Sequence, residues 1–145
     1  MILLDANILL YAYDSEASQH AASAKWLHRL MRGPEIVGIP WQTIWAFVRI
    51  RTNIRLVRRP QPPEATFQIV REWLALPGVV TVQPGPLHAK LLEKLVVGHQ
   101  ATGPLLSDAA LAALAIEHGA VLASTDRDFS RFPEVRWVNP LESDA

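Results

Sequence analysis

Short apolar runs recur along the chain and separate longer stretches in which apolar residues follow helical spacing. The first run, at residues 1–4, is apolar without alternation, which is typical of a strand buried on both faces of a parallel sheet. Runs at residues 35–39, 79–82 and 120–123 predict three more strands, and residues 135–138 predict an edge strand. The pattern therefore predicts five short strands spread over the whole chain.

Between these runs, the spacing of apolar residues predicts helices. The expected ranges are about 8–13, 14–31, 41–53, 64–76, 87–97 and 105–118. Asp14, Ser15 and Glu16 supply N-cap residues for the second helix, and Gly119 closes the last one. Strands that alternate with helices in this way predict an α/β sandwich with a mostly parallel central sheet. Right-handed crossovers would bring the carboxyl ends of its strands to one edge.

We predict buried side chains from the third helix and from the five tryptophans. Spacing of i, i+3, i+4, i+7 predicts an inward face made of Trp41, Ile44, Trp45 and Val48. Core packing is also the expectation for Trp73 and Trp137. Trp26 and Trp45 can instead line an exposed groove for a partner helix, because aromatic residues are enriched at interfaces.

Composition narrows the class of protein further. With 145 residues, half of them hydrophobic, the chain predicts one domain, residues 1–145, with a substantial core. No apolar run reaches the roughly 18 residues of a membrane span, so we expect no membrane partner. The absence of cysteine excludes disulfides and thiolate metal sites and fits a cytoplasmic protein. A net charge of zero means that any polyanion must be bound locally.

Four aspartates stand where the predicted fold gathers polar groups. Asp5 and Asp126 each follow a short apolar strand, Asp108 opens the Ala/Leu-rich helix, and Asp128 lies just past Asp126. Each acid alone also fits a helix cap or a turn residue. Together on one edge, however, their charges would repel one another unless a cation lay among them. Hard oxygen ligands suit Mg²⁺ or Mn²⁺, so the pattern predicts metal-dependent hydrolysis of a phosphodiester.

Motifs in a fixed order give the chain a family resemblance. They are residues 4–7 (LDAN), 106–115 (LSDAALAALA), 125–129 (TDRDF) and 137–140 (WVNP). This ordered set resembles PIN-domain ribonucleases, and more specifically the VapC-type toxins of prokaryotic toxin–antitoxin pairs. The resemblance spans nearly the whole chain, with matching order and length.

The resemblance implies a PIN-like sandwich with the activity of an endoribonuclease. Such a toxin of a type II toxin–antitoxin pair depends on Mg²⁺, or on Mn²⁺, and cleaves structured RNA such as tRNA or rRNA. It is a homodimer that a cognate antitoxin protein holds inactive. The resemblance assigns catalysis and metal binding to Asp5, Asp108 and Asp126, accessory metal binding to Asp128, and supporting roles to Thr125 and Asn7.

One position departs from the family pattern. Where the family usually carries a glutamate, on the helix after the second strand, this chain has Ala46. A metal would then have fewer protein oxygens, and Gln42, one turn earlier, is a candidate to bridge through a water. The same departure favours a second hypothesis, in which a catalytically weak or inactive PIN domain binds RNA or an antitoxin without cutting.

Five arginines fall between residues 49 and 59, and they have two functional interpretations. They can bind RNA phosphates through charge-assisted hydrogen bonds, or they can meet acidic groups on an antitoxin. The structural alternative is a solvated helix end with cations near the negative end of the helix dipole. Arg49, which shares a helical face with Ala46, and Arg55 are our candidates for substrate binding.

Overall fold

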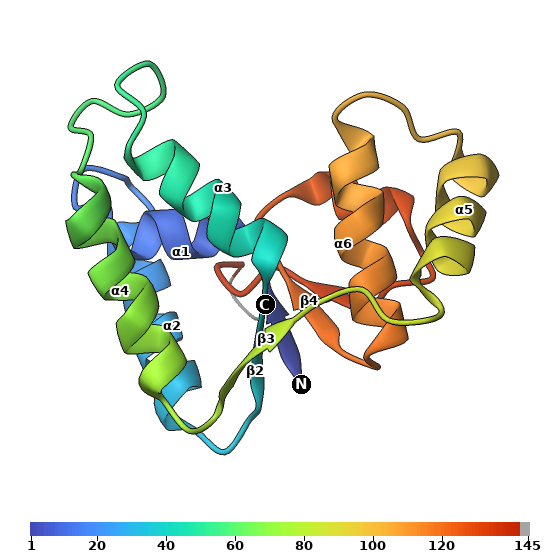
Figure 1. Ribbon diagram of the computed structural model, residues 1–145, viewed down its shortest axis with the longest axis horizontal. Coiled ribbons are helices and arrows are strands. Elements are labelled where there is room, and N and C mark those ends of the chain that lie inside the picture. The colour runs from blue at the N-terminus through green and yellow to red at the C-terminus, as the bar shows by residue number, and fades with distance from the viewer. Residues whose placement is uncertain (143–145) are drawn as a thin grey trace.

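A five-stranded parallel sheet forms the centre of the computed structural model, which describes residues 1–142 (Figure 1). The strands are β1 (Ile2–Leu4), β2 (Val37–Pro40), β3 (Val79–Val82), β4 (Val121–Ala123) and β5 (Trp137–Val138). Their order across the sheet is β3-β2-β1-β4-β5, and each neighbouring pair is parallel. The predicted α/β sandwich is therefore confirmed, with β1 in the middle of the sheet and β5 at its edge.

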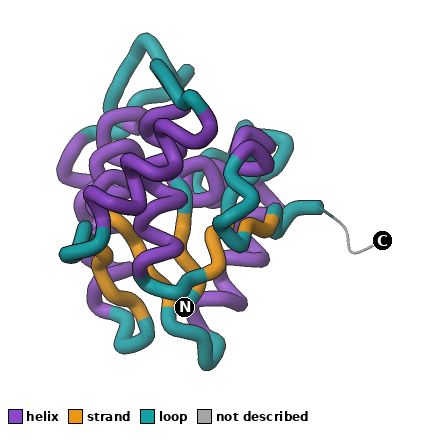
Figure 2. Tube along the Cα trace, turned by 90° about the vertical axis from the view of Figure 1, so that its right-hand side faces the viewer, coloured by secondary structure: helices purple, strands orange, loops and turns teal. Residues whose placement is uncertain are grey.

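Helices surround this sheet on two sides. They are α1 (Ala6–Ala12), α2 (His20–Arg32), α3 (Trp41–Arg51), α4 (Pro63–Ala75), α5 (His88–His99), α6 (Leu105–Glu117) and the 3₁₀ helix η1 (Arg127–Arg131). In Figure 1, α1 to α4 lie to the left of the strands and α5 and α6 lie to the right. Figure 2, turned by 90°, shows the strands side by side. The architecture is thus helix, sheet, helix.

Alternate residues of the strands face two separate cores. Leu3 and Leu122 belong to the core beneath α5 and α6, whereas Leu4 and Ala123, the next residues of the same strands, belong to the core beneath α1 to α4. All four side chains are fully buried. Because helices cover both faces of the sheet, a strand has no face for polar residues, which explains the unbroken apolar run at the start of the chain.

Two glycines meet steric demands that shape this sheet. A Cβ atom at Gly38 would lie 2.9 Å from both Met1 Sδ and Val82 Cγ2, so β2 packs closely only because position 38 has no side chain. Gly119 follows α6 with a φ of +62°, a left-handed conformation that glycine adopts easily. This turn sends the chain from α6 directly into β4, and it places the start of α6 near the carboxyl end of the sheet.

The second helix begins later than predicted. Asp14 does not cap it, because Asp14 Oδ1 accepts the N–H of Glu16 at 3.0 Å and the Asp14 carbonyl accepts the N–H of Ala17 at 3.1 Å. These local turns satisfy the polar groups of the segment without a helix. The helix α2 therefore starts at His20, and the predicted start near residue 14 is wrong.

The buried face of α3 is only partly the predicted one: Ile44 is buried and Val48 packs against the core, as predicted. Trp41 and Trp45 are 39% and 68% exposed, whereas Thr43 and Phe47 are buried. Thr43 can be buried because its Oγ1 donates a hydrogen bond to the carbonyl oxygen of Leu4 at 2.9 Å. A sequence pattern counts this threonine as a polar, outward residue, although it belongs to the core. The helix is therefore rotated away from the predicted orientation, and the inward packing predicted for Trp41 and Trp45 is wrong.

The other tryptophans pack in the protein to different degrees. Trp73 is 2% exposed, which confirms its predicted place in the core, and its ring contacts those of Tyr13 and Phe47. Trp137 and Trp26 are half-buried against the two cores. Among the helices of residues 1–142, none is long and apolar enough to cross a membrane.

Candidate metal centre

Asp5 is the first residue after β1, and three hydrogen bonds hold its carboxylate. Oδ1 accepts the N–H of Ala6 at 2.7 Å, which makes Asp5 the N-cap of α1. Oδ2 accepts the hydroxyl of Ser124 at 2.6 Å and the side-chain amide of Asn7 at 3.3 Å. The capping role and a place in a polar site are therefore compatible, since the two oxygens have different partners.

Ser124 connects the elements of this site. It is fully buried directly after β4, and its hydroxyl donates to Asp5 while accepting from Asn7 Nδ2 and from the backbone N–H of Asp126, both at 3.0 Å. One donor and two acceptor positions of the hydroxyl are thus all used. The β1 and β4 ends of the sheet are consequently joined through a single side chain.

Ser124 is not among the site residues predicted from the sequence, where its neighbour Thr125 stands instead. Thr125 contributes its backbone N–H, which donates to Asn7 Oδ1 at 3.3 Å. A serine after a strand carries no charge signal, but strand register would identify it. Residues 4 and 123 pair across neighbouring parallel strands, so the residues that follow them, Asp5 and Ser124, lie side by side.

Three further carboxylates come together beside Asp5. One oxygen atom from each of Asp108, Asp126 and Asp128 lies within 4.8 Å of the others. Asp108 is in the first turn of α6, Asp126 caps η1, and Asp126 Oδ1 accepts the N–H of Asp128 at 2.9 Å. Asp5 is adjacent to this group and not a member of it. The four acids predicted from the sequence thus meet at one edge of the sheet.

Burial and neighbouring negative charges raise the pKa of two of the acids, Asp108 and Asp5. Burial, followed by the charges of Asp126, Asp5 and Asp128, raises the pKa of Asp108 to about 6. Burial also raises the pKa of Asp5, against the hydrogen bond from Ser124, which lowers it. Carboxylates that destabilise one another's ionised form make a site at which a divalent cation is favoured. Their oxygens are the ligands that Mg²⁺ and Mn²⁺ prefer.

Helix α3 approaches the acids from the other side of the site. Gln42 Nε2 donates to the carbonyl oxygen of Ser107 at 3.4 Å, a long hydrogen bond next to Asp108. Ala46 follows one turn later on α3 and is half-buried. Gln42 is thus near the acids, and its bridging through a water stays a prediction.

The two arginines predicted to bind substrate are exposed. Arg49 lies on α3 two turns after Gln42, about 10 Å along the helix axis. Arg55 lies beyond the helix, where its backbone N–H donates to Asn53 Oδ1 at 2.9 Å. Within residues 1–142, neither arginine forms an ion pair with a carboxylate. Both side chains are therefore accessible, and their role in substrate binding stays a prediction.

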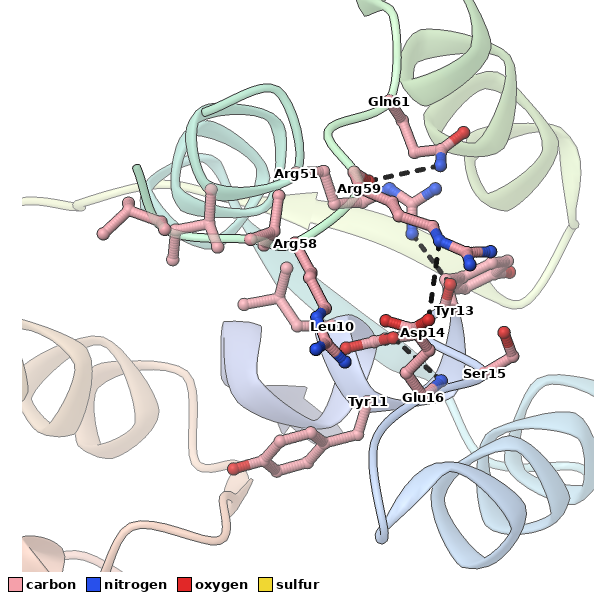
Figure 3. Close-up of a pocket in the computed structure, with 13 residues that line it drawn as sticks. Leu10, Tyr11, Tyr13, Asp14, Ser15, Glu16, Arg51, Arg58, Arg59 and Gln61 are labelled. Carbon is pink, nitrogen blue, oxygen red and sulfur yellow. Dashed lines mark hydrogen bonds and ion pairs between the residues drawn. The ribbon is translucent and has the colours of Figure 1, made fainter. Parts of the chain in front are cut away.

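Other arginines of the cluster line a separate cavity of about 430 Å³ at the C-terminal ends of α1 and α3 (Figure 3). Arg51 is fixed there, because its Nη1 donates to the carbonyl oxygen of Tyr13 at 3.0 Å and its guanidinium lies 5.3 Å from the centre of the Phe47 ring. Arg59 lies 3.5 Å from Glu16. None of the four acids lines this cavity, so Arg51 belongs to the fold and not to the acidic site.

The sequence matches known proteins over nearly its whole length. The sequence profile of the PIN domain matches residues 2–135. Ribonuclease VapC37 of Mycobacterium tuberculosis is 42% identical over 140 residues, which cover 97% of this chain and 97% of the relative.

Solved structures share the fold at lower identity. VapBC-1 from nontypeable Haemophilus influenzae superposes with a TM-score of 0.73 at 17% identity, over 98% of this chain and 100% of that one. VapC20 of Mycobacterium tuberculosis, described as a sarcin–ricin loop cleaving toxin, has a TM-score of 0.64 at 18% identity, over 94% of this chain and 99% of that one. At these identities the likeness shows the fold alone.

Proposed function

Because the chain belongs to the PIN-domain family and has ribonucleases named VapC among its relatives, we propose that it is a divalent-metal-dependent endoribonuclease, the toxin of a type II toxin–antitoxin pair. The observation that carries the metal dependence is the group of Asp108, Asp126 and Asp128, whose oxygens lie within 4.8 Å of one another. Asp5 adjoins this group and adds a fourth carboxylate, so that the site would be strongly anionic without a cation.

The residues of this site fit a hard cation. Asp108, Asp126 and Asp128 each offer one carboxylate oxygen, and no thiolate is present because the chain has no cysteine. Mg²⁺ prefers oxygen ligands of this kind, and Mn²⁺ also accepts them. When bound, such an ion lowers the pKa of a water ligand and offsets the charge that develops on a phosphodiester during hydrolysis.

The chain's own residues hold the acids in position. The Ser124 hydroxyl fixes Asp5 and the backbone of Asp126, so the two strand ends keep a constant separation. Asp108, with a pKa of about 6, is largely ionised at pH 7 and takes up a proton as the pH falls below 6. A proton on Asp108 competes with a cation for the carboxylate, so metal binding should weaken as the pH is lowered through 6.

The relatives and the surface support a proposal for the partners. One structural neighbour is described as a sarcin–ricin loop cleaving toxin, and another is a VapBC complex, so we propose structured RNA as substrate and a cognate antitoxin as inhibitor. Trp45 on α3 is 68% exposed, which supports a protein contact there, either with a second copy in a homodimer or with the antitoxin. An RNA-cleaving toxin would act in the cytoplasm.

Metal binding and RNA cleavage, measured on the same protein, test the proposal. We expect Mn²⁺ binding in isothermal titration calorimetry, and discrete cuts in tRNA or rRNA that require Mg²⁺ or Mn²⁺. Asp126→Asn should weaken both strongly. Asp14→Asn is the matched control, because Asp14 is an exposed acid outside the site, and it should change neither.

Two outcomes would contradict the proposal in different ways. Metal binding without cleavage of RNA would favour the second hypothesis, a PIN domain that binds RNA or an antitoxin, for which Ala46 is the supporting feature. Cleavage that persists in EDTA and in Asp126→Asn would mean that the acids are not the reactive centre.

A further inference from the structure

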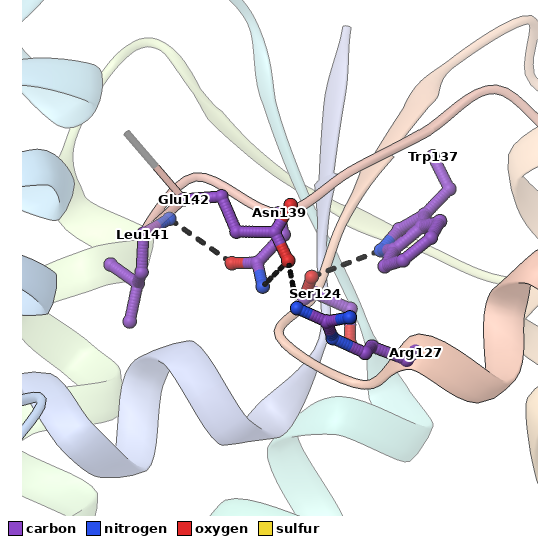
Figure 4. A network of polar contacts seen from close by, with 6 residues as sticks. All are labelled: Ser124, Arg127, Trp137, Asn139, Leu141 and Glu142. Atoms are coloured by element: carbon purple, nitrogen blue, oxygen red, sulfur yellow. Dashed lines mark hydrogen bonds and ion pairs between the residues drawn. The ribbon is translucent and has the colours of Figure 1, made fainter. Parts of the chain in front are cut away.

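In the sequence, one arginine lies between two acids of the candidate metal centre, and its side chain forms an ion pair with a different carboxylate. Arg127 follows Asp126 and precedes Asp128, and its Nη2 lies 3.0 Å from Glu142 Oε1 (Figure 4). The two side chains are 83% and 54% exposed. Arg127 therefore lies in the loop that carries Asp126 and Asp128. Its guanidinium, however, contacts Glu142 in the C-terminal segment, residues 137–142.

The C-terminal segment is bound to this loop at two places. Trp137 Nε1 donates to the carbonyl oxygen of Ser124 at 2.9 Å, which fixes β5 beside the start of the loop. Asn139 Nδ2 then donates to Glu142 Oε1 at 3.3 Å, and this oxygen also accepts from Arg127. The hydrogen bond from Asn139 thus fixes the position of Glu142, whereas both side chains of the Arg127–Glu142 pair are exposed to water.

We propose that Arg127 is a substrate-binding residue, and that Glu142 holds it in the absence of RNA and competes with an RNA phosphate for it; this inference rests on the proposed function. One divalent ion leaves part of the charge of the four carboxylates uncompensated, so a further cation close to them favours the approach of an RNA phosphate. Arg127 is on the same loop as two of the acids. A guanidinium can bind a phosphate through two parallel hydrogen bonds.

Exposed ion pairs are weak, which makes the exchange feasible. A solvated Arg–Glu pair contributes little because water and salt screen it and both long side chains lose freedom. A phosphate placed at the site by other contacts can therefore displace Glu142. By contrast, Arg51 could not be exchanged in this way, since a backbone carbonyl and aromatic rings hold it.

The inference predicts effects of opposite sign for the two partners. Binding of a fluorescein-labelled RNA hairpin is measured by fluorescence anisotropy in buffers that contain Ca²⁺, over a series of KCl concentrations. Glu142→Gln should tighten binding about two- to fivefold, because it frees the arginine. Arg127→Ala should weaken binding about tenfold and reduce the slope of log Kd against log [KCl] by roughly 0.7–0.9, the loss of one phosphate contact. The double variant should behave like Arg127→Ala.

Arg131→Ala is the matched control, since Arg131 is an exposed arginine of the same 3₁₀ helix. It should leave the salt slope unchanged. If Arg127→Ala and Glu142→Gln both weaken RNA binding and both lower the melting temperature, the pair only anchors the C-terminal segment, and the inference is wrong. An Arg127→Ala slope equal to that of Arg131→Ala would also overturn it. If the wild-type protein neither binds nor cleaves RNA, the proposed function itself fails, and the role of Arg127 with it.

Discussion

Removing one charge from the acidic site should stabilise the protein when no metal is bound. The pKa of Asp108 is raised from 3.8 to about 6, so the folded protein binds a proton at Asp108 more tightly than the unfolded chain does. The contribution of Asp108 to stability is then greatest below pH 4 and decreases as the pH rises from about 4 through about 6. An asparagine side chain cannot ionise, so the Asp108→Asn variant should lack this decrease.

The pKa change sets the size of the effect. A difference of 6 − 3.8 ≈ 2.2, at about 1.36 kcal/mol for each pKa unit, gives an upper bound of about 3 kcal/mol. Because Asp108 is only half-buried, water screens its charge, and about 1 kcal/mol is the realistic gain. For a chain of this length, a gain of 1 kcal/mol corresponds to roughly 2–4 °C in the melting temperature.

Thermal unfolding in EDTA at pH 4 and pH 8 measures this gain. We expect Asp108→Asn to match the wild-type protein at pH 4 and to melt about 2–4 °C higher at pH 8. Saturating Mg²⁺ should reverse the order, because a ligand at 100 times its Kd adds about 2.7 kcal/mol to the protein that binds it. Glu93→Gln, which removes one exposed acid on α5, should change neither comparison. If Asp108→Asn melts below the wild-type protein at pH 8 without metal, the acids do not repel one another as argued.

Three further substitutions test separate parts of the site. Ser124→Ala should lower the free energy of unfolding by about 1–3 kcal/mol in urea titrations, because it removes the buried hydroxyl that donates to Asp5 Oδ2 and accepts the N–H of Asp126. Ala46→Glu should tighten Mn²⁺ binding in calorimetry about tenfold by adding a carboxylate on α3; unchanged affinity would mean that Ala46 does not face the metal. Gln42→Ala should weaken metal binding and cleavage a few-fold if Gln42 bridges through a water, and equal values for both proteins would exclude the bridge.

Much of the fold is predictable because the strands are buried on both faces. A strand such as β1, with Leu3 and Leu4 in different cores, must be apolar throughout, and this signal is local in the sequence. The buried face of α3, part of which was predicted wrongly, depends on a contact between distant residues. Thr43 is a core residue only because the carbonyl oxygen of Leu4 accepts its hydroxyl. No pattern within residues 41–53 contains that information.

The residues of the candidate metal centre also divide into those that the sequence predicts and those whose role depends on the fold. Asp5 and Asp126 are found from the sequence because an acid within three residues of the end of an apolar strand is conspicuous. Ser124 is not found, because its role depends on the pairing of β1 with β4, which places it beside Asp5. The raised pKa of Asp108 likewise comes from burial and from acids that are distant in sequence, and composition could not have indicated it.

The positions of the acids in the fold indicate how much the metal centre depends on position 46, where this chain has alanine in place of the family's glutamate. Asp108, Asp126 and Asp128, which form the close group, come from α6 and from the loop after β4, on the side of the sheet that packs against one core. Helix α3 belongs to the other core and contributes only the long hydrogen bond of Gln42. Since the close group contains no residue of α3, an alanine at position 46 leaves the arrangement of Asp108, Asp126 and Asp128 intact. Metal affinity should therefore depend far more on Asp126 and Asp128 than on any residue of α3.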